Sequence, residues 1–273
     1  MPVQTKADGG DDRANAIVVA VACQKGGVGK TTSALALAER LTMSGFRVLL
    51  VDLDAQGNAT YATGLTGERN AFAALQRPAE AKREIQKSGW GMDVLASVPA
   101  LANADSVFAE TGREYLLREV LEPIAGDYDY IVVDTPPSLG VLTVNALAAA
   151  QFVVVPTPAE MFGAQGLHQL AQTVGTVRKY CNPKLEIAGV LLTRFNGRTV
   201  IRREVARLLE ETARQIGAKV FSEPVRECTA VVEAQAVRQG VFSYAPKSNA
   251  ALDLDKFVDE LLVRMGRKEE RNG

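Results

Sequence analysis

Cysteines, long apolar runs and charge of one sign are all scarce in this chain of 273 residues. The three cysteines (Cys23, Cys181 and Cys228) are odd in number, far apart and form no Cys-x-x-Cys pair. This pattern is typical of reduced thiols in a cytosol and argues against a disulfide framework or a cysteine metal site. A chain of this length buries enough surface to fold without such cross-links.

No apolar run of the sequence approaches the roughly 20 residues that are needed to cross a bilayer. The N-terminal stretch MPVQTKADGGDDRANA has neither the basic start nor the apolar middle of a signal peptide. We therefore expect a cytoplasmic protein with a short disordered lead over residues 1–15. Residues 16–273 are interpreted as one domain, because no linker or internal repeat is visible.

Charge of one sign is not in excess, since the formal net charge is −1. This value argues against a basic coat over the whole surface, as a general nucleic-acid binder would have, but it permits a local basic face.

Short apolar runs alternate with longer stretches of helical periodicity along the chain. Strands are predicted over residues 17–23, 47–52, 92–96, 130–134, 151–156 and 186–193, and helices over residues 31–43, 70–76, 113–121, 139–150 and 252–265. Strands that are apolar throughout and separated by helices indicate a parallel sheet covered on both faces. The expected fold class is therefore α/β, with a single doubly wound, mostly parallel sheet. Such sheets bind ligands at the carboxyl ends of their strands.

The segment QKGGVGKTT, residues 24–32, lies between the first strand and the first helix. Its glycines allow successive backbone N–H groups to curl around phosphate oxygens, and the helix that follows adds a positive dipole. Lys30 would reach the β and γ phosphates, and the Thr31 hydroxyl would bind Mg²⁺. The predicted nucleotide-binding residues are Lys25, Gly26, Gly27, Val28, Gly29, Lys30, Thr31 and Thr32.

This loop departs from the common pattern G-x-x-x-x-G-K-[ST], because Gln24 stands at the first glycine and Lys25 is an additional lysine. In both respects it resembles the deviant P-loop ATPases, which include ParA, MinD and the nitrogenase iron protein. The resemblance implies a P-loop NTPase fold in which Lys25 reaches the nucleotide of a partner subunit. Such a lysine offsets the charge of two ATP molecules held between subunits, so that dimerisation depends on ATP.

The segment DLDAQGN, residues 52–58, resembles the D-x-D-P-Q-G-N motif of that family, with Ala55 in place of proline. The match implies that Asp54 orients the attacking water and that Asp52 supports the magnesium shell. Asp134, which ends YIVVD, matches the second carboxylate motif and would bind Mg²⁺ through a water. Simple capping of a strand end remains the alternative for these aspartates.

Phosphoryl transfer requires mainly positioning and charge neutralisation, and no arginine finger or glutamate base is apparent. The sequence therefore predicts an ATPase that uses ATP and Mg²⁺, with Asp54, Lys25 and Lys30 as catalytic residues. Its intrinsic hydrolysis of ATP to ADP and phosphate is expected to be slow. Asn196, in TRFN, and Pro224 resemble the family's contacts with adenine, although ordinary turn chemistry explains both equally well.

Four segments resemble the ParA partition ATPases in particular: DLDAQGNAT, DTPPSLG, AEMF with the GLHQL that follows it, and VFSYAPKSNAALD. Because no N-terminal DNA-binding domain precedes the loop, the resemblance is to the short ParA branch. It implies an ATP-sandwich dimer that binds DNA without sequence preference on the nucleoid. A ParB-like centromere-binding protein would stimulate hydrolysis and release the dimer, and plasmid or chromosome DNA would thereby be segregated.

Residues 194–238 hold nine basic and six acidic side chains, so this part of the chain has a local excess of positive charge. Basic side chains neutralise phosphates and release counterions, which gives DNA binding without sequence preference. Arg202, Arg203 and Arg226 are the candidate DNA contacts, with a solvated helix face as the alternative interpretation.

A MinD-like ATPase that regulates division-site placement at the membrane is the alternative function. Such proteins end in a basic amphipathic helix that lies on anionic lipid. Residues 252–265 have apolar helical spacing, but the first turns are acidic and the tail RKEERNG lacks bulky apolar anchors. We therefore expect no membrane partner.

Overall fold

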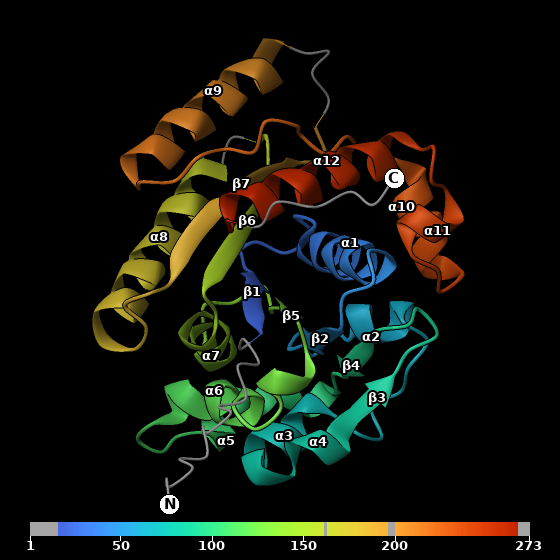
Figure 1. Cartoon of the computed structure of the whole chain (residues 1–273). Coiled ribbons are helices and arrows are strands. Elements are labelled where there is room, and N and C mark those ends of the chain that lie inside the picture. Colours follow the sequence, from blue (N-terminus) through green and yellow to red (C-terminus); the bar gives the residue numbers. More distant parts are fainter. Residues whose placement is uncertain (1–15, 161–162, 196–199, 267–273) are drawn as a thin grey trace, which may run out of the picture.

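A seven-stranded sheet forms the centre of the computed structural model, which describes residues 16–160, 163–195 and 200–266 (Figure 1). The strands are β1 (Ile17–Val21), β2 (Val48–Asp52), β3 (Ile85–Lys87), β4 (Asp93–Leu95), β5 (Tyr130–Asp134), β6 (Phe152–Pro158) and β7 (Glu186–Thr193). Their order is β3-β4-β2-β5-β1-β6-β7, and all neighbours are parallel except β3 and β4. The predicted α/β fold with a mostly parallel sheet is therefore confirmed.

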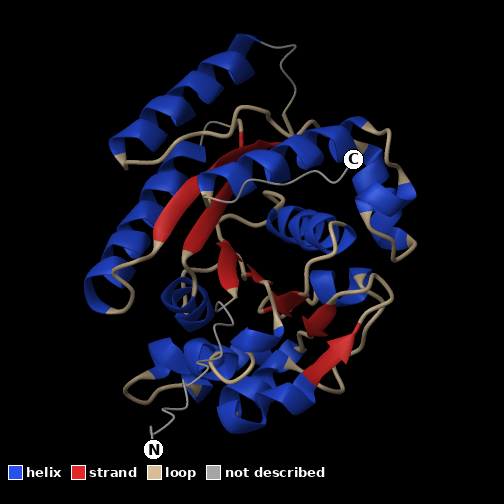
Figure 2. Ribbon diagram, in the orientation of Figure 1, coloured by secondary structure: helices blue, strands red, loops and turns tan. Residues whose placement is uncertain are grey.

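Helices cover both faces of this sheet (Figure 2). One face is covered by α3 (Ala71–Gln76), α4 (Ala81–Glu84), α5 (Ala104–Val107), α6 (Leu116–Leu121), α7 (Val141–Ala149), α8 (Gly163–Tyr180) and α9 (Val200–Gln215). The other face is covered by α1 (Lys30–Met43), α2 (Asn58–Ala62), α11 (Val241–Tyr244) and α12 (Asn249–Arg264), while α10 (Thr229–Ala236) lies beside α11 and α2. None of the helices in the described ranges is both long and apolar enough to span a membrane.

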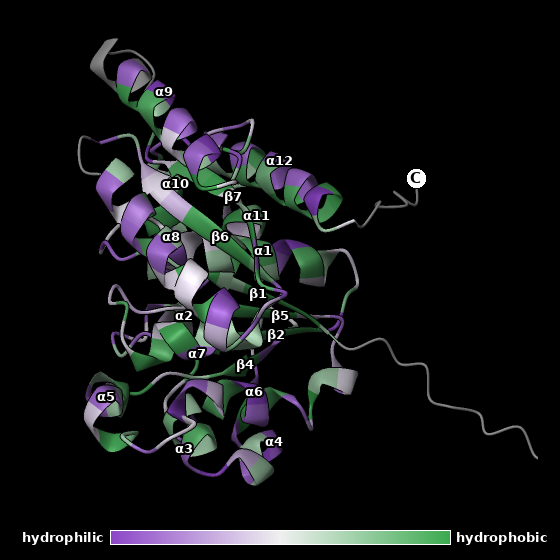
Figure 3. Cartoon of the chain, turned by 90° about the vertical axis from the view of Figure 1, so that its left-hand side faces the viewer, coloured by the Kyte–Doolittle hydropathy of each residue, from purple (hydrophilic) through white to green (hydrophobic). Residues whose placement is uncertain are grey.

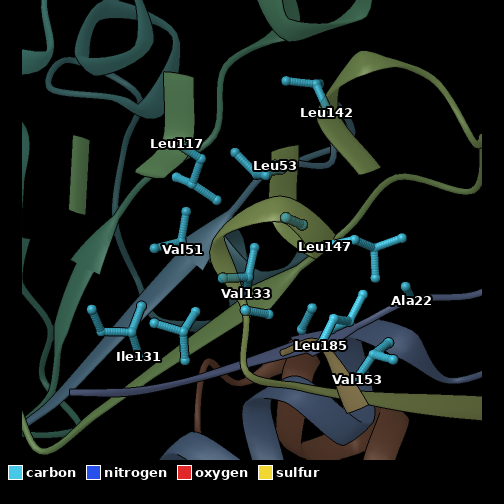
Figure 4. Close-up of a cluster of buried hydrophobic side chains, with 14 of the residues drawn as sticks. Ala22, Val51, Leu53, Leu117, Ile131, Val133, Leu142, Leu147, Val153 and Leu185 are labelled. Carbon is cyan, nitrogen blue, oxygen red and sulfur yellow. The ribbon is translucent and has the colours of Figure 1, made fainter. Parts of the chain in front are cut away.

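Successive strand residues alternate between two hydrophobic cores. Val18 and Ala20 belong to the core under α6, α7 and α8, whereas Val19 and Val21 belong to the core under α1 and α12. This alternation follows from the two-residue period of a strand, and it explains why strands buried on both sides are apolar throughout. Figure 4 shows part of the first of these cores, where the strand residues Val51, Ile131, Val133 and Val153 lie among side chains from the covering helices.

The predicted strand over residues 130–134 and that over residues 186–193 have the bounds that the structure shows. The prediction missed β3, a strand of three half-exposed or exposed residues that pairs antiparallel with β4 at the sheet edge. Such a short segment carries too little apolar periodicity to be recognised. The helix predicted over residues 113–121 begins as a 3₁₀ turn at Arg113–Tyr115 before α6.

Candidate nucleotide-binding site

The loop between β1 and α1 has the backbone that its glycines allow. Gly27 and Gly29 have φ angles of 70° and 91°, which lie in the left-handed region that residues with a Cβ rarely adopt. Gly29 is the N-cap of α1, so the helix begins at Lys30 and its N-terminus faces the loop. Lys30 is buried, and its ammonium group donates a hydrogen bond of 3.0 Å to the carbonyl oxygen of Lys25. The lysine therefore lies inside the curve of the loop.

A cavity of about 470 Å³ opens beside this loop. Six of the predicted residues line it: Gly26, Gly27, Gly29, Lys30, Thr31 and Thr32. Burial lowers the pKa of Lys30, and the nearby Asp134 carboxylate opposes this shift. Val28 is placed differently, because its side chain is buried and its carbonyl oxygen accepts a hydrogen bond of 2.7 Å from the Thr193 hydroxyl. Val28 thus joins the loop to β7.

The loop after β2 brings Asp54 to the same cavity. Asp54 is partly exposed; its Oδ1 accepts a hydrogen bond from the Gln56 N–H, and its carbonyl oxygen accepts one from the Gly57 N–H. Asn58, at the start of α2, is a further lining residue. The conformation of this loop therefore turns the Asp54 side chain toward the phosphate-binding loop.

Asp52 lies below Asp54 and does not line the cavity. Its Oδ2 accepts hydrogen bonds of 2.8 Å from both the backbone N–H and the hydroxyl of Thr60, and its Oδ1 accepts one from the Asp54 N–H. Burial raises the pKa of Asp52 to about 6, although these donors lower it. The contacts show that Asp52 holds the Asp54 loop against α2.

Asp134 ends β5 and is fully buried, and its carboxylate oxygens accept no hydrogen bond of regular geometry from the described residues, although the Thr31 hydroxyl lies beside them. Burial raises its pKa, and the adjacent Asp52 raises it further, while the Thr31 hydroxyl and the Lys30 ammonium group lower it. A buried carboxylate without donors costs free energy unless a cation compensates it. The donor set of Asp134 and Thr31 therefore fits a hard cation such as Mg²⁺.

Lys25 is not among the residues that line the cavity, and its side chain is bonded to another part of the chain. Its ammonium group lies 2.5 Å from Oε2 of Glu160, in the segment between β6 and α8. Both side chains are about half exposed, at 45% each. The additional lysine of the loop is thus paired within its own subunit.

One wall of the cavity is built by residues that the sequence did not point to as nucleotide contacts. Its lining comes from the segment 225–228, from α10 and from the start of α12: Val225, Arg226, Glu227, Cys228, Val231, Val232, Gln235 and Leu254. Pro224 precedes this wall but does not line it, and Asn196 lies outside the described residues. No local motif marks this wall, because its parts meet only in the folded chain.

Two of the candidate DNA contacts, Arg202 and Arg203, belong to α9, and their side chains lie outside what the structure describes. Figure 3 shows hydrophilic and hydrophobic segments alternating along α9, which packs on α8. Arg226 is at the cavity wall, where its guanidinium group forms an ion pair of 2.6 Å with Asp253. Arg226 therefore belongs to the cavity wall, whereas Arg202 and Arg203 belong to α9.

Comparisons with known proteins agree with this geometry. A family model described as an AAA domain matches residues 16–187. The chromosome-partitioning ATPase Soj of Thermus thermophilus is 38% identical over 253 residues, which cover 93% of this chain and 98% of that protein.

Two solved structures are similar to the whole fold. The first, described as cobyrinic acid a,c-diamide synthase from Mycobacterium smegmatis with a bound ATP analogue and magnesium, is 34% identical, with a TM-score of 0.81 over 93% of this chain and 97% of that one. The second, a putative plasmid partition protein from Borrelia burgdorferi bound to AMPPNP, has a TM-score of 0.77 over 92% of this chain and 99% of that one. Its identity of 23% makes it evidence for the fold alone.

Proposed function

The chain belongs to the ParA/Soj family of P-loop ATPases, and on this premise we propose that it is a partition ATPase that dimerises with ATP, binds DNA and is released by hydrolysis. One observation carries the proposal. The phosphate-binding loop and Asp54 line a single cavity, whereas the Lys25 side chain lies outside that cavity, paired with Glu160. The parts for holding and cleaving a nucleotide are therefore in one subunit, and a further cation is available for a neighbour.

ATP would bind with its phosphates in the loop at residues 26–32. The N–H groups at the start of α1 and the buried Lys30 would neutralise the phosphate charge. The Thr31 hydroxyl would hold Mg²⁺ directly and Asp134 would hold it through a water, which fits the unpartnered carboxylate of Asp134. The ion, when bound, neutralises charge on the phosphates.

Asp54 would orient the attacking water, because it is the one of the three aspartates that lines the cavity, while Asp52 and Asp134 are buried. The hydrogen bonds of its own loop fix the direction of its side chain. No arginine from the cavity wall is free of other bonds in the contacts described, since Arg194 pairs with Glu227 and Arg226 with Asp253. Slow intrinsic hydrolysis follows, and a ParB-like partner would accelerate it.

Lys25 would leave Glu160 and contact the nucleotide of a second subunit. Two bound triphosphates facing each other carry a high negative charge, so a lysine from each side stabilises the dimer only when ATP is present. The dimer would join two copies of the basic region around α9, with Arg202 and Arg203 as the contacts to DNA phosphates. Non-specific binding to the nucleoid in the bacterial cytoplasm would then depend on ATP.

The experiment measures sedimentation and DNA retention for the wild-type chain, Lys25→Ala and Lys30→Ala, each with and without Mg²⁺-ATP. We expect the wild type to dimerise and bind DNA only with ATP. Lys25→Ala should bind ATP but stay monomeric, and Lys30→Ala should lose ATP binding, because the phosphates lose the cation inside the loop. A wild-type chain that dimerises equally without nucleotide, or does not retain DNA with ATP, contradicts the proposal.

A MinD-like role at a membrane is disfavoured by the position of α12. Its apolar residues Leu254, Phe257, Val258 and Leu261 are buried in the core against α1. This face cannot lie on lipid while the chain is folded. Adding vesicles of anionic lipid as a third arm of the same experiment separates the two functions, because a MinD-like protein would sediment with the vesicles in an ATP-dependent manner.

A further inference from the structure

Asp253 is a buried carboxylate that the proposed chemistry does not use. It lies in the first turns of α12 and is only 2% exposed. Arg226 donates three hydrogen bonds to it, from the backbone N–H at 3.0 Å, from Nε at 2.8 Å and from Nη2 at 2.6 Å. The guanidinium group therefore binds the carboxylate through two hydrogen bonds, and the backbone N–H of Arg226 adds a third. Bidentate arginine–carboxylate pairs are among the strong hydrogen bonds of proteins.

This pair fixes the segment 225–228, which forms one wall of the cavity. On one side the segment is bonded to β7 and its extension, because the Val225 N–H donates to the Leu192 carbonyl and the Val225 carbonyl accepts from the Phe195 N–H. On the other side Asp253 binds Arg226. Leu254, the next residue of α12, lines the cavity itself.

The pair also links this wall to the phosphate-binding loop. α12 packs on α1, the helix that begins at Lys30. The position of the wall relative to α1 is thus set in part through α12, and Asp253 is the residue of α12 to which Arg226 of the wall is bonded. The loop has hydrogen bonds of its own and to β7, and Arg194 joins its Gly27 carbonyl to Glu227 of the wall.

We propose that Asp253 is a positioning residue for nucleotide recognition: through Arg226 it holds the wall that receives the nucleoside part of the ligand. The inference rests on the proposed function, because it assumes that the phosphates occupy the loop at residues 26–32. The wall around it is mostly apolar, with Val225, Val231 and Leu254, as suits the flat face of a base. Replacing the carboxylate by an amide removes the negative charge and one of the two acceptor oxygens, so Arg226 loses the ion pair and the bidentate contact that hold the segment on that side.

The test compares two ligands, ATP and inorganic tripolyphosphate, each with Mg²⁺, by calorimetry. In Asp253→Asn we expect ATP to bind about tenfold more weakly, whereas tripolyphosphate, which has no nucleoside, should change less than about twofold. Arg226→Lys keeps the charge but cannot form the bidentate pair. It should show the same selective loss, and it serves as the second variant if Asp253→Asn does not fold.

Glu260→Gln is the matched control. Glu260 lies on the same helix, pairs with Arg264 at 2.6 Å and accepts a hydrogen bond from the Ser222 N–H, but it does not line the cavity. This variant should bind ATP like the wild type. Unchanged ATP affinity in both Asp253→Asn and Arg226→Lys, or equal losses for ATP and tripolyphosphate, would overturn the inference. A wild-type chain that binds neither ligand would instead refute the proposed function.

Discussion

Lys25 and Glu160 are 135 residues apart in the sequence, yet their side chains form an exposed ion pair. Exposed pairs of this kind contribute about 0.2–1 kcal/mol, because water screens the charges and both side chains lose freedom. The pair therefore holds Lys25 only weakly. A weak hold suits a lysine that must exchange one partner for another when a second subunit approaches.

Replacing Glu160 by glutamine should favour the ATP-dependent dimer. Lys25 would no longer be withdrawn by its own subunit, so we expect the ATP concentration at half-maximal dimerisation to fall about two- to fivefold, as the strength of a surface pair implies. Light scattering during an ATP titration measures this. Glu223→Gln, which removes the similarly exposed pair with Lys256, is the control and should leave the titration unchanged. Weaker dimerisation of Glu160→Gln would mean that Glu160 acts on the neighbouring subunit instead.

Among the elements, α1 and α11 meet at a close contact that leaves no room for a side chain at Gly240. Glu39 of α1 is buried and accepts hydrogen bonds from the Phe242 N–H, the Ser243 N–H and the Ser243 hydroxyl at the start of α11. A Cβ at Gly240, the N-cap of α11, would overlap the Glu39 carboxyl group. This contact joins the helix that follows the phosphate-binding loop to the C-terminal helices.

Gly240→Ala should therefore lower the free energy of unfolding by about 1–3 kcal/mol, the usual cost of overpacking a buried contact. Denaturant melts of the chain without nucleotide measure the change. Gly175→Ala is the matched control, since Gly175 is exposed within α8 and no heavy atom would meet its new Cβ within 4 Å. That variant should be about 0.5–1 kcal/mol more stable, because alanine favours a helix interior. Equal effects of the two substitutions would contradict the proposed packing.

The elements also show what a sequence can predict. β5 and β7 were predicted with the bounds observed, because a buried strand in a parallel sheet needs an unbroken apolar run. The phosphate-binding loop was equally evident, since its glycines, lysine and threonine lie in one segment. The wall at residues 225–228 was not, and neither was the pair of Arg226 with Asp253, because these contacts depend on packing between distant segments.

For the molecule as a whole, the order of the strands places the site. β1 lies between β5 and β6, and β2 is the next strand beyond β5. The carboxyl ends of β1, β5 and β2 therefore carry, side by side, the phosphate-binding loop, Asp134 and the Asp54 loop, which makes this edge the natural ligand site of a doubly wound sheet. The two hydrophobic cores lie on the two faces of the sheet. The pairing of β5 with β1 and with β2 fixes the register of the three strand ends.

In this arrangement the residues proposed to bind Mg²⁺-ATP differ from the residue proposed to orient the attacking water. Asp54→Ala should therefore lose ATP hydrolysis and keep ATP binding. The variant should bind Mg²⁺-ATP, because Lys30, Thr31 and Asp134 remain, and it should dimerise, because Lys25 remains. Only the step that ends the dimer would be lost, so the protein should accumulate as an ATP-bound dimer on DNA. Gel filtration and DNA retention, each with ATP, measure this.

The fraction of Asp54→Ala protein that accumulates as the ATP-bound dimer depends on how much of the hydrolysis activity is lost. Moving a two-state population from 1:99 to 99:1 requires about 5.5 kcal/mol, so a modest defect in positioning the water would trap only part of the protein. Asp54→Glu, which keeps a carboxylate one methylene further out, should give such a partial trap. If Asp54→Ala binds ATP normally and yet stays monomeric, then Asp54 acts in the dimer interface or near the ion, because a residue that acts only on the water cannot affect assembly.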